Sequence, residues 1–164
     1  MDVKDCRQLT FTLNGGDYGF PIHTVSEVIG LMEIKHVPKT PDYVRGIINL
    51  RGKIMPVMDL RLKFGMPEAD YNERTSIIIL SANINGAKKS IGVVVDRISE
   101  VIDINPDDIE PPPQYGAKET VSFLNGIGKF KDKVLMLLNI DEVVSSKDLA
   151  SFFNEEAKKI LAKA

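Results

Sequence analysis

The chain has 164 residues, a formal net charge of -2 and a single cysteine, Cys6. A chain of this length folds as one domain or two small lobes with a sizeable core, and we treat residues 1–164 as one domain. The mild negative charge argues against a nucleic-acid-binding protein, and one cysteine excludes an internal disulfide framework. No run approaches the ~20 apolar residues that cross a membrane, and the N-terminus lacks an apolar signal-peptide core. We therefore expect a cytoplasmic protein.

Short strand-like runs separated by turn residues fill most of the chain. They predict strands over residues 8–14, 18–22, 27–32, 46–50 and 53–58, then over residues 76–83, 90–96, 100–104, 123–130 and 134–138. Asn85-Gly86 is typical of a two-residue hairpin turn. Apolar residues on one face predict an amphipathic C-terminal helix over residues 147–162. The pattern indicates a mainly β protein with this one helix.

The two series of strands resemble each other. Residues 18–29 align without a gap with residues 91–102 and share the segment Ser-Glu-Val-Ile. Residues 44–64 align in the same way with residues 124–144. We therefore expect a duplicated β unit, with approximate lobes over residues 7–72 and 73–146 between which strands are free to cross. A groove should separate the two lobes.

The stretch "NLRGKIMPVMDLR", residues 49–61, reads as two strands joined by the loop Arg51-Gly52. Gly52 is suited to a positive φ in this loop. The second unit has Lys131-Asp132 at the matched place. A turn is needed in both units but arginine is not, which leaves Arg51 free for a role beyond folding. Asp59 and Asn139 also match, as residues that can cap a helical turn.

The residues that usually carry catalysis or bind metal ions do not gather in any recognisable pattern. His23 and His36 are the only histidines, and neither has metal-ligand spacing with Cys6 or a carboxylate. The acidic residues around Pro106 read better as a capped helical turn than as a cation site. The sequence therefore predicts no enzyme, no metal and no cofactor.

The segment "TPDYVRGIINLRGKIMPVMDLRLKFG" followed by "IGVVVDRISEVIDI" resembles the CheW adaptor family of bacterial chemotaxis. The resemblance extends from about residue 7 to about residue 144. It implies two SH3-like five-stranded β-barrels around a shared core. It also implies a non-catalytic scaffold that couples methyl-accepting chemoreceptors to the histidine kinase CheA.

The resemblance implies particular partners. They are the regulatory domain of CheA and the cytoplasmic tips of the chemoreceptors. Whether other CheW copies join them in rings stays open from sequence. The protein would be recruited from the cytoplasm to membrane-bound receptor arrays, without nucleic acid and without inserting into the membrane itself.

By the family pattern, the partner-binding hairpin contains Asn49, Arg51 and Gly52, with Arg45 and Glu27 beside it. The planar fork of an arginine suits a partner's carboxylate or backbone carbonyls. The alternative for Arg51 is a bond to Glu27 or Asp59 of its own fold. The alternative for Arg45 and Glu27 is an exposed charge of little energetic consequence.

The resemblance also places a receptor helix in an apolar groove between the lobes. We expect Val25, Val28, Ile98 and Val101 to line this groove, because they occupy matched positions around the repeated Ser-Glu-Val-Ile segment. The alternative for each is burial in its own barrel.

Two other functions stay open from sequence. One is an adaptor of another chemosensory pathway, such as surface motility. The other is a small β-barrel that binds single-stranded nucleic acid, whose binding would collapse with added salt.

Overall fold

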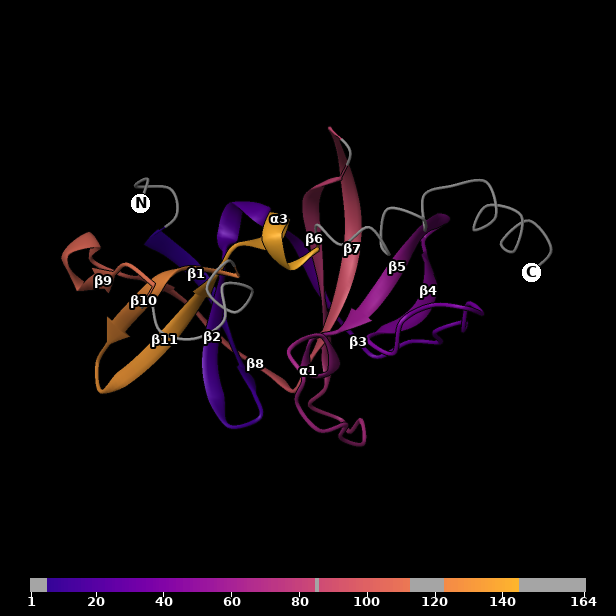
Figure 1. Ribbon diagram of the computed structural model, residues 1–164, viewed down its shortest axis with the longest axis horizontal. Coiled ribbons are helices and arrows are strands. Elements are labelled where there is room, and N and C mark those ends of the chain that lie inside the picture. The colour runs from indigo at the N-terminus through magenta and orange to yellow at the C-terminus, as the bar shows by residue number, and fades with distance from the viewer. Residues whose placement is uncertain (1–5, 85, 113–122, 145–164) are drawn as a thin grey trace.

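Two β-sheets lie side by side in the computed structural model, which describes residues 6–84, 86–112 and 123–144 (Figure 1). One sheet has five strands and the other has six. The predicted C-terminal helix over residues 147–162 lies outside the described residues. The mainly β class is confirmed.

The five-stranded sheet consists of β3 (Val25–Gly30), β4 (Val44–Leu50), β5 (Lys53–Asp59), β6 (Ser76–Ile84) and β7 (Ala87–Val95). The six-stranded sheet consists of β1 (Arg7–Leu13), β2 (Gly16–Pro21), β8 (Arg97–Asp103), β9 (Ile109–Glu110), β10 (Leu124–Phe130) and β11 (Lys133–Leu138). The short helices are η2 (Ile22–Thr24), α1 (Leu60–Lys63), η3 (Pro106–Asp108) and α3 (Ile140–Val143).

The first hairpin of each repeated unit lies in the same sheet as the later strands of the other unit. The hairpin β1–β2 belongs to the sheet of β8, β10 and β11, whereas β6–β7 belongs to the sheet of β3, β4 and β5. The strand orders are β8-β1-β2-β11-β10-β9 and β3-β6-β7-β5-β4. Apart from the additional strand β9, they become identical when β1 to β5 are matched with β6, β7, β8, β10 and β11. Even the parallel pairs correspond, because β5 pairs with β7 and β11 pairs with β2. The duplication seen in the sequence is therefore a duplication of structure, with the hairpins exchanged.

Matched polar residues begin the two α-helical turns. The side chain of Asp59 accepts hydrogen bonds from the backbone amides of Arg61 and Leu62 at the start of α1. Asn139 accepts one from the amide of Asp141 at the start of α3. Both residues satisfy amides that have no partner within the helix, as the sequence predicted.

The hydrophobic core has one shared part and two smaller ones. The shared part contains Phe11 and Leu13 from one sheet and Ile78, Leu80 and Ile91 from the other. Separate clusters fill the far sides of the two sheets, around Ile48, Met55 and Ile77 in one and around Ile102, Leu135 and Leu137 in the other. Side chains on both faces of the central strands are therefore removed from water, and the shared cluster holds the sheets together.

Candidate functional site

The hairpin β4–β5 ends in a tight two-residue turn. Leu50 pairs with Lys53, which leaves Arg51 and Gly52 as the loop, with φ angles of 52° and 85°. Two central residues with positive φ define a type I′ turn, the form that suits the twist of a β-hairpin. The amide of Gly52 also donates a hydrogen bond of 2.8 Å to Oδ1 of Asn49. The predicted positive φ of Gly52 is confirmed.

Arg51 contacts a residue of the opposite sheet edge. Its Nη2 donates to Oε1 of Glu27, and the Arg51 side chain remains 70% exposed. Glu27 lies in β3 and Arg51 follows β4, and these are the two outer strands of the five-stranded sheet. Of the two intramolecular partners considered from sequence, Glu27 is the one observed. Because Arg51 is largely solvated, a pair of this kind contributes at most about 1 kcal/mol to stability.

Arg45 lies in a polar network instead of standing free. Its guanidinium contacts Glu68, the hydroxyl of Tyr71 at 3.1 Å and the carboxylate of Asp59 at 3.6 Å. Tyr71 donates a 2.7 Å hydrogen bond to Oδ2 of Asp59, which is 1% exposed. The network attaches the segment after α1 to the strands β4 and β5. Arg45 therefore has a structural role.

The same network changes the acidity of its members. Burial lowers the pKa of Arg45, but the hydrogen bond to Glu68 and the contacts with Tyr71 and Asp59 outweigh it, so the net pKa is raised. Burial, followed by the hydrogen bond to Asp59, raises the pKa of the Tyr71 hydroxyl. Arg45 is thus charged and Tyr71 neutral at physiological pH.

The four predicted groove residues divide into two pairs. Val25 and Ile98 are partly buried and pack against the shared core. Val28 and Val101 are exposed, with 40% and 51% of their surfaces accessible. The pairs correspond across the duplication, with one member on β3 and the other on β8. An apolar surface residue is therefore available on each of these outer strands.

A second polar network, not predicted from sequence, joins the two sheets. Arg61 of α1 makes two 2.7 Å hydrogen bonds to Asp96, the residue between β7 and β8. Asp96 also accepts one from the amide of Asn14 in the turn between β1 and β2. Partial burial raises the pKa of Asp96, but the hydrogen bonds from Arg61 and Asn14 outweigh it and the net pKa is lowered.

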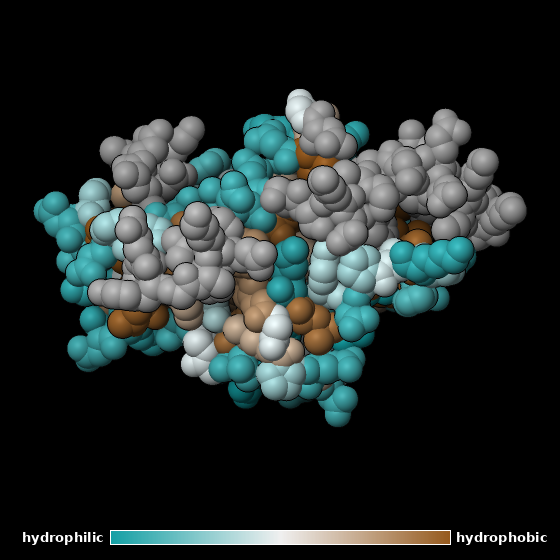
Figure 2. Space-filling view, viewed as in Figure 1, coloured by the Kyte–Doolittle hydropathy of each residue, from teal (hydrophilic) through white to brown (hydrophobic). Residues whose placement is uncertain are grey.

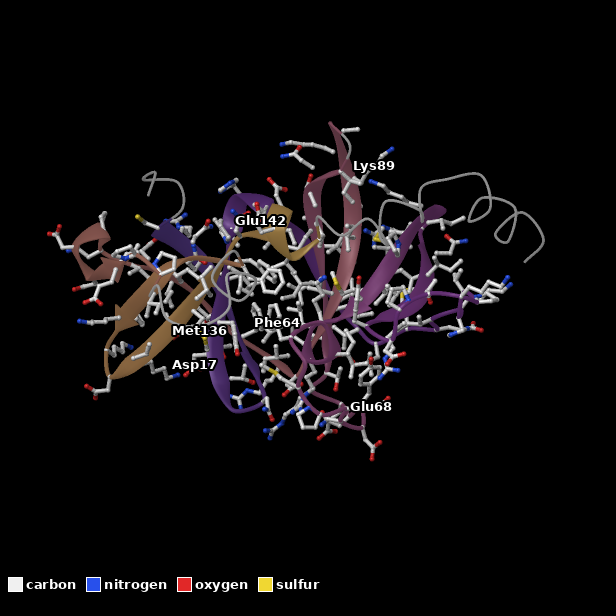
Figure 3. The ribbon with its side chains drawn as sticks, in the orientation of Figure 1. Asp17, Phe64, Glu68, Lys89, Met136 and Glu142 are labelled. Carbon is white, nitrogen blue, oxygen red and sulfur yellow. The ribbon has the colours of Figure 1, made fainter. Side chains whose placement is uncertain are left out.

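The sequence also did not predict the residues that line a hollow of about 530 Å³. Figure 2 shows hydrophobic atoms in the middle of the face that it presents. The hollow is lined mainly by apolar residues, and Figure 3 labels two of them, Phe64 and Met136. The ring of Phe64 lies 6.1 Å from Tyr18 and 5.4 Å from Phe123. These residues come from β2, β11 and segments outside the strands. No local sequence pattern links them, so these lining residues could not be predicted.

Reactive groups do not converge in the part of the chain that the structure describes. No three side chains of His, Cys, Asp or Glu lie together there as a metal site would require. Within the same residues, no helix has the length and apolar character needed to span a membrane. The described residues therefore form a module of two intertwined β-sheets, whose surface carries exposed valines, a solvated arginine and two polar networks.

The comparisons with known proteins agree on one family. The CheW-like domain profile matches residues 7–148. The chemotaxis protein CheW of Klebsiella aerogenes is 34% identical over 142 residues, which cover 87% of this chain and 83% of that protein. CheW of Helicobacter pylori is 35% identical over 134 residues, covering 82% and 78%.

A solved structure supports the same assignment. The crystal structure of the scaffolding protein TtCheW from Thermoanaerobacter tengcongensis matches with a TM-score of 0.77 and 36% identity, over 88% of this chain and 95% of that one. The chain belongs to the CheW family. It is a non-catalytic adaptor of chemotaxis signalling, and the predicted function and SH3-like lobes are confirmed.

Proposed function

We propose that this protein links the regulatory domain of a cognate CheA kinase to the cytoplasmic tips of methyl-accepting chemoreceptors, with Arg51 in the kinase contact. The observation that carries the proposal is the hairpin tip, where a 70% exposed arginine stands on a defined turn beside Glu27. A guanidinium in this position can form paired hydrogen bonds with a partner's carboxylate or carbonyl groups. Asn49 and Gly52 complete the turn, and Arg45 supports the base of the same hairpin.

The receptor surface of the proposal consists of the outer strands β3 and β8. Val28 and Val101 are the exposed apolar contacts, and Val25 and Ile98 support them from the core side. A few apolar anchors with a polar rim are typical of a groove that accepts an amphipathic helix. Binding in the micromolar range, near -8 kcal/mol, suits reversible signalling contacts.

The two hairpin tips supply a way to assemble arrays. The tips of β4–β5 and β10–β11 lie at opposite ends of the molecule (Figure 1). Ile54 beside the first tip is 38% exposed and Val134 beside the second is 60% exposed. A molecule with an apolar contact at each end can join neighbours on both sides, which supports rings that include further CheW copies and recruitment to membrane-bound arrays.

The test is titration calorimetry with the purified CheA regulatory domain and, separately, with a receptor cytoplasmic fragment. We expect Arg51→Ala to weaken kinase binding at least tenfold while the protein stays folded by circular dichroism. The pair Val28→Ser with Val101→Ser should weaken receptor binding and leave kinase binding within twofold. Failure of the unaltered protein to bind either partner would contradict the proposal. Binding of Arg51→Ala at full strength would remove Arg51 from the kinase contact.

A further inference from the structure

The two matched hairpins have different turns. In β4–β5 both loop residues, Arg51 and Gly52, have positive φ. In β10–β11 the loop consists of Lys131 and Asp132, and only Lys131 has a positive φ, of 57°. The two turns therefore differ in conformation, although both close a two-residue loop between corresponding strands.

One side-chain hydrogen bond accompanies the difference. Oδ1 of Asn49 accepts the 2.8 Å hydrogen bond from the Gly52 amide, across the turn. The matched residue in the second hairpin is Lys129, whose side chain has no acceptor atom and instead donates to Glu110 at 3.0 Å. The Asn49 side chain thus satisfies a loop amide in the first hairpin, and the matched Lys129 side chain cannot accept such a hydrogen bond in the second.

Glycine is needed at position 52 because of its backbone conformation, and not because a side chain would lack room. A Cβ atom built on Gly52 meets nothing within 4 Å. Its φ of 85° is nevertheless one that residues other than glycine rarely adopt. Asn49 and Gly52 together favour the type I′ turn, and this turn fixes where the Arg51 side chain begins.

We propose that Asn49 is a positioning residue for Arg51 and makes no contact with the partner itself. By holding the Gly52 amide, it maintains the turn that directs Arg51 toward Glu27 and toward the kinase surface. This inference rests on the proposed function, and it changes the predicted role of Asn49 from binding to positioning.

The experiment compares Asn49→Ala, Asn49→Asp and the matched control Lys129→Ala as full-length proteins. Each is titrated with the CheA regulatory domain in 0.3 M salt, which screens the charge added by Asp. We expect Asn49→Ala to weaken binding about three- to tenfold, the equivalent of one lost hydrogen bond. Asn49→Asp keeps an oxygen acceptor and should bind within twofold of the unaltered protein, as should Lys129→Ala.

A double-mutant cycle separates positioning from contact. If Asn49 acts through Arg51, adding Asn49→Ala to Arg51→Ala should weaken binding no further. Additive losses, or failure of Asn49→Asp to restore binding, would overturn the inference and place Asn49 in the interface.

A measurement on the free protein tests the positioning role of Asn49 independently of the proposed function. The three-bond coupling between the amide and Cα protons of Arg51, measured by NMR in the free protein, reports its φ angle. It should change in Asn49→Ala and be restored in Asn49→Asp. An unchanged coupling in Asn49→Ala would refute the positioning role even if kinase binding fell. Absence of kinase binding by the unaltered protein would refute the proposed function and leave this coupling as the test of the turn.

Discussion

Arg45 and Arg51 lie near opposite ends of β4, and the first is partly buried while the second is exposed. Arg45 is held by Asp59, Tyr71 and Glu68, whereas Arg51 pairs with Glu27 at the surface. The sequence predicted the positive φ of Gly52, because turn chemistry is local. It also named Glu27, a residue of a distant strand, among two partners for Arg51. It missed the Arg45 network because Tyr71 and Glu68 lie in a segment without regular structure, whose path depends on the folded strands.

Tyr71 should stabilise the fold through its hydroxyl. In Tyr71→Phe, Oδ2 of the buried Asp59 loses its 2.7 Å hydrogen-bond donor. We expect the free energy of unfolding to fall by about 1–3 kcal/mol, because a hydrogen bond to a charged group is lost and Oδ2 keeps only the 3.6 Å contact with Arg45. Urea unfolding followed by circular dichroism measures it.

Glu68→Gln is the control for Tyr71→Phe. Its side chain is 66% exposed, and breaking the pair with Arg45 should change stability by less than about 1 kcal/mol. Equal losses in the two variants would show that the Tyr71 hydroxyl has no special role.

Gly46 should not tolerate a side chain. Its φ is 145°, and an added Cβ would lie 2.0 Å from the carbonyl oxygen of Lys35. That oxygen accepts the 2.9 Å hydrogen bond from the amide of Ile47, so it cannot move away without breaking the bridge. We expect Gly46→Ala to destabilise the protein by more than about 3 kcal/mol.

Gly30→Ala provides the comparison for Gly46, because a Cβ at Gly30 meets nothing within 4 Å. Its free energy of unfolding should stay within about 1 kcal/mol of the unaltered protein. A mild effect of Gly46→Ala in the same thermal-unfolding series would show that the Lys35 segment is free to shift.

At the scale of the elements, hairpins and caps were predictable but their assignment to sheets was not. Neighbouring residues determine the tight turns, the alternation of apolar residues and the matched caps at Asp59 and Asn139. The pairing of β1 with β8 joins residues more than eighty positions apart, such as Thr10, whose hydroxyl donates to the Glu100 carbonyl. Such pairing is decided by packing in three dimensions, and a local pattern does not specify it.

The Arg61–Asp96 contact between elements should give a pH-dependent contribution to stability. The folded pKa of Asp96 is lowered, so its contribution is present above its unfolded pKa of about 4 and is lost as pH falls through the folded value. The difference in unfolding free energy between the unaltered protein and Asp96→Asn should therefore be full at pH 6 and shrink below about pH 4.

The control for this pH dependence is the same Asp96→Asn change made in Arg61→Gln. Without the guanidinium, the hydrogen bonds that lower the pKa of Asp96 are reduced, so the stability difference should depend less on pH. A pH profile that is the same in both backgrounds would assign the effect to other carboxylates. Urea titrations from pH 2.5 to pH 6 provide the comparison.

At the scale of the whole molecule, the exchanged hairpins make each sheet depend on both units. Residues 7–72 contain β1 to β5, and these strands belong to two different sheets. The shared core likewise draws residues from both sheets. Neither unit can complete a sheet or bury its apolar surface by itself.

Separate fragments should therefore fold only together. We expect residues 1–72 and residues 73–164, expressed apart, to lack a cooperative thermal transition. Mixed in equal amounts, they should associate one to one and regain the β-sheet circular dichroism of the intact chain. A cooperative transition in either fragment alone would contradict this view of the architecture. Analytical ultracentrifugation would establish the stoichiometry.

The exchanged hairpins also bear on how such a molecule can arise and diversify. A single copy of the repeated unit needs a second copy to finish its sheets, so the arrangement is that of an intertwined homodimer whose two chains have been joined end to end. In a homodimer both tips would have to carry the same turn. Once joined, one half could keep Asn49, Arg51 and Gly52 while the other took Lys129, Lys131 and Asp132. After such a fusion, the two hairpin tips of a pseudosymmetric molecule can bind different partners.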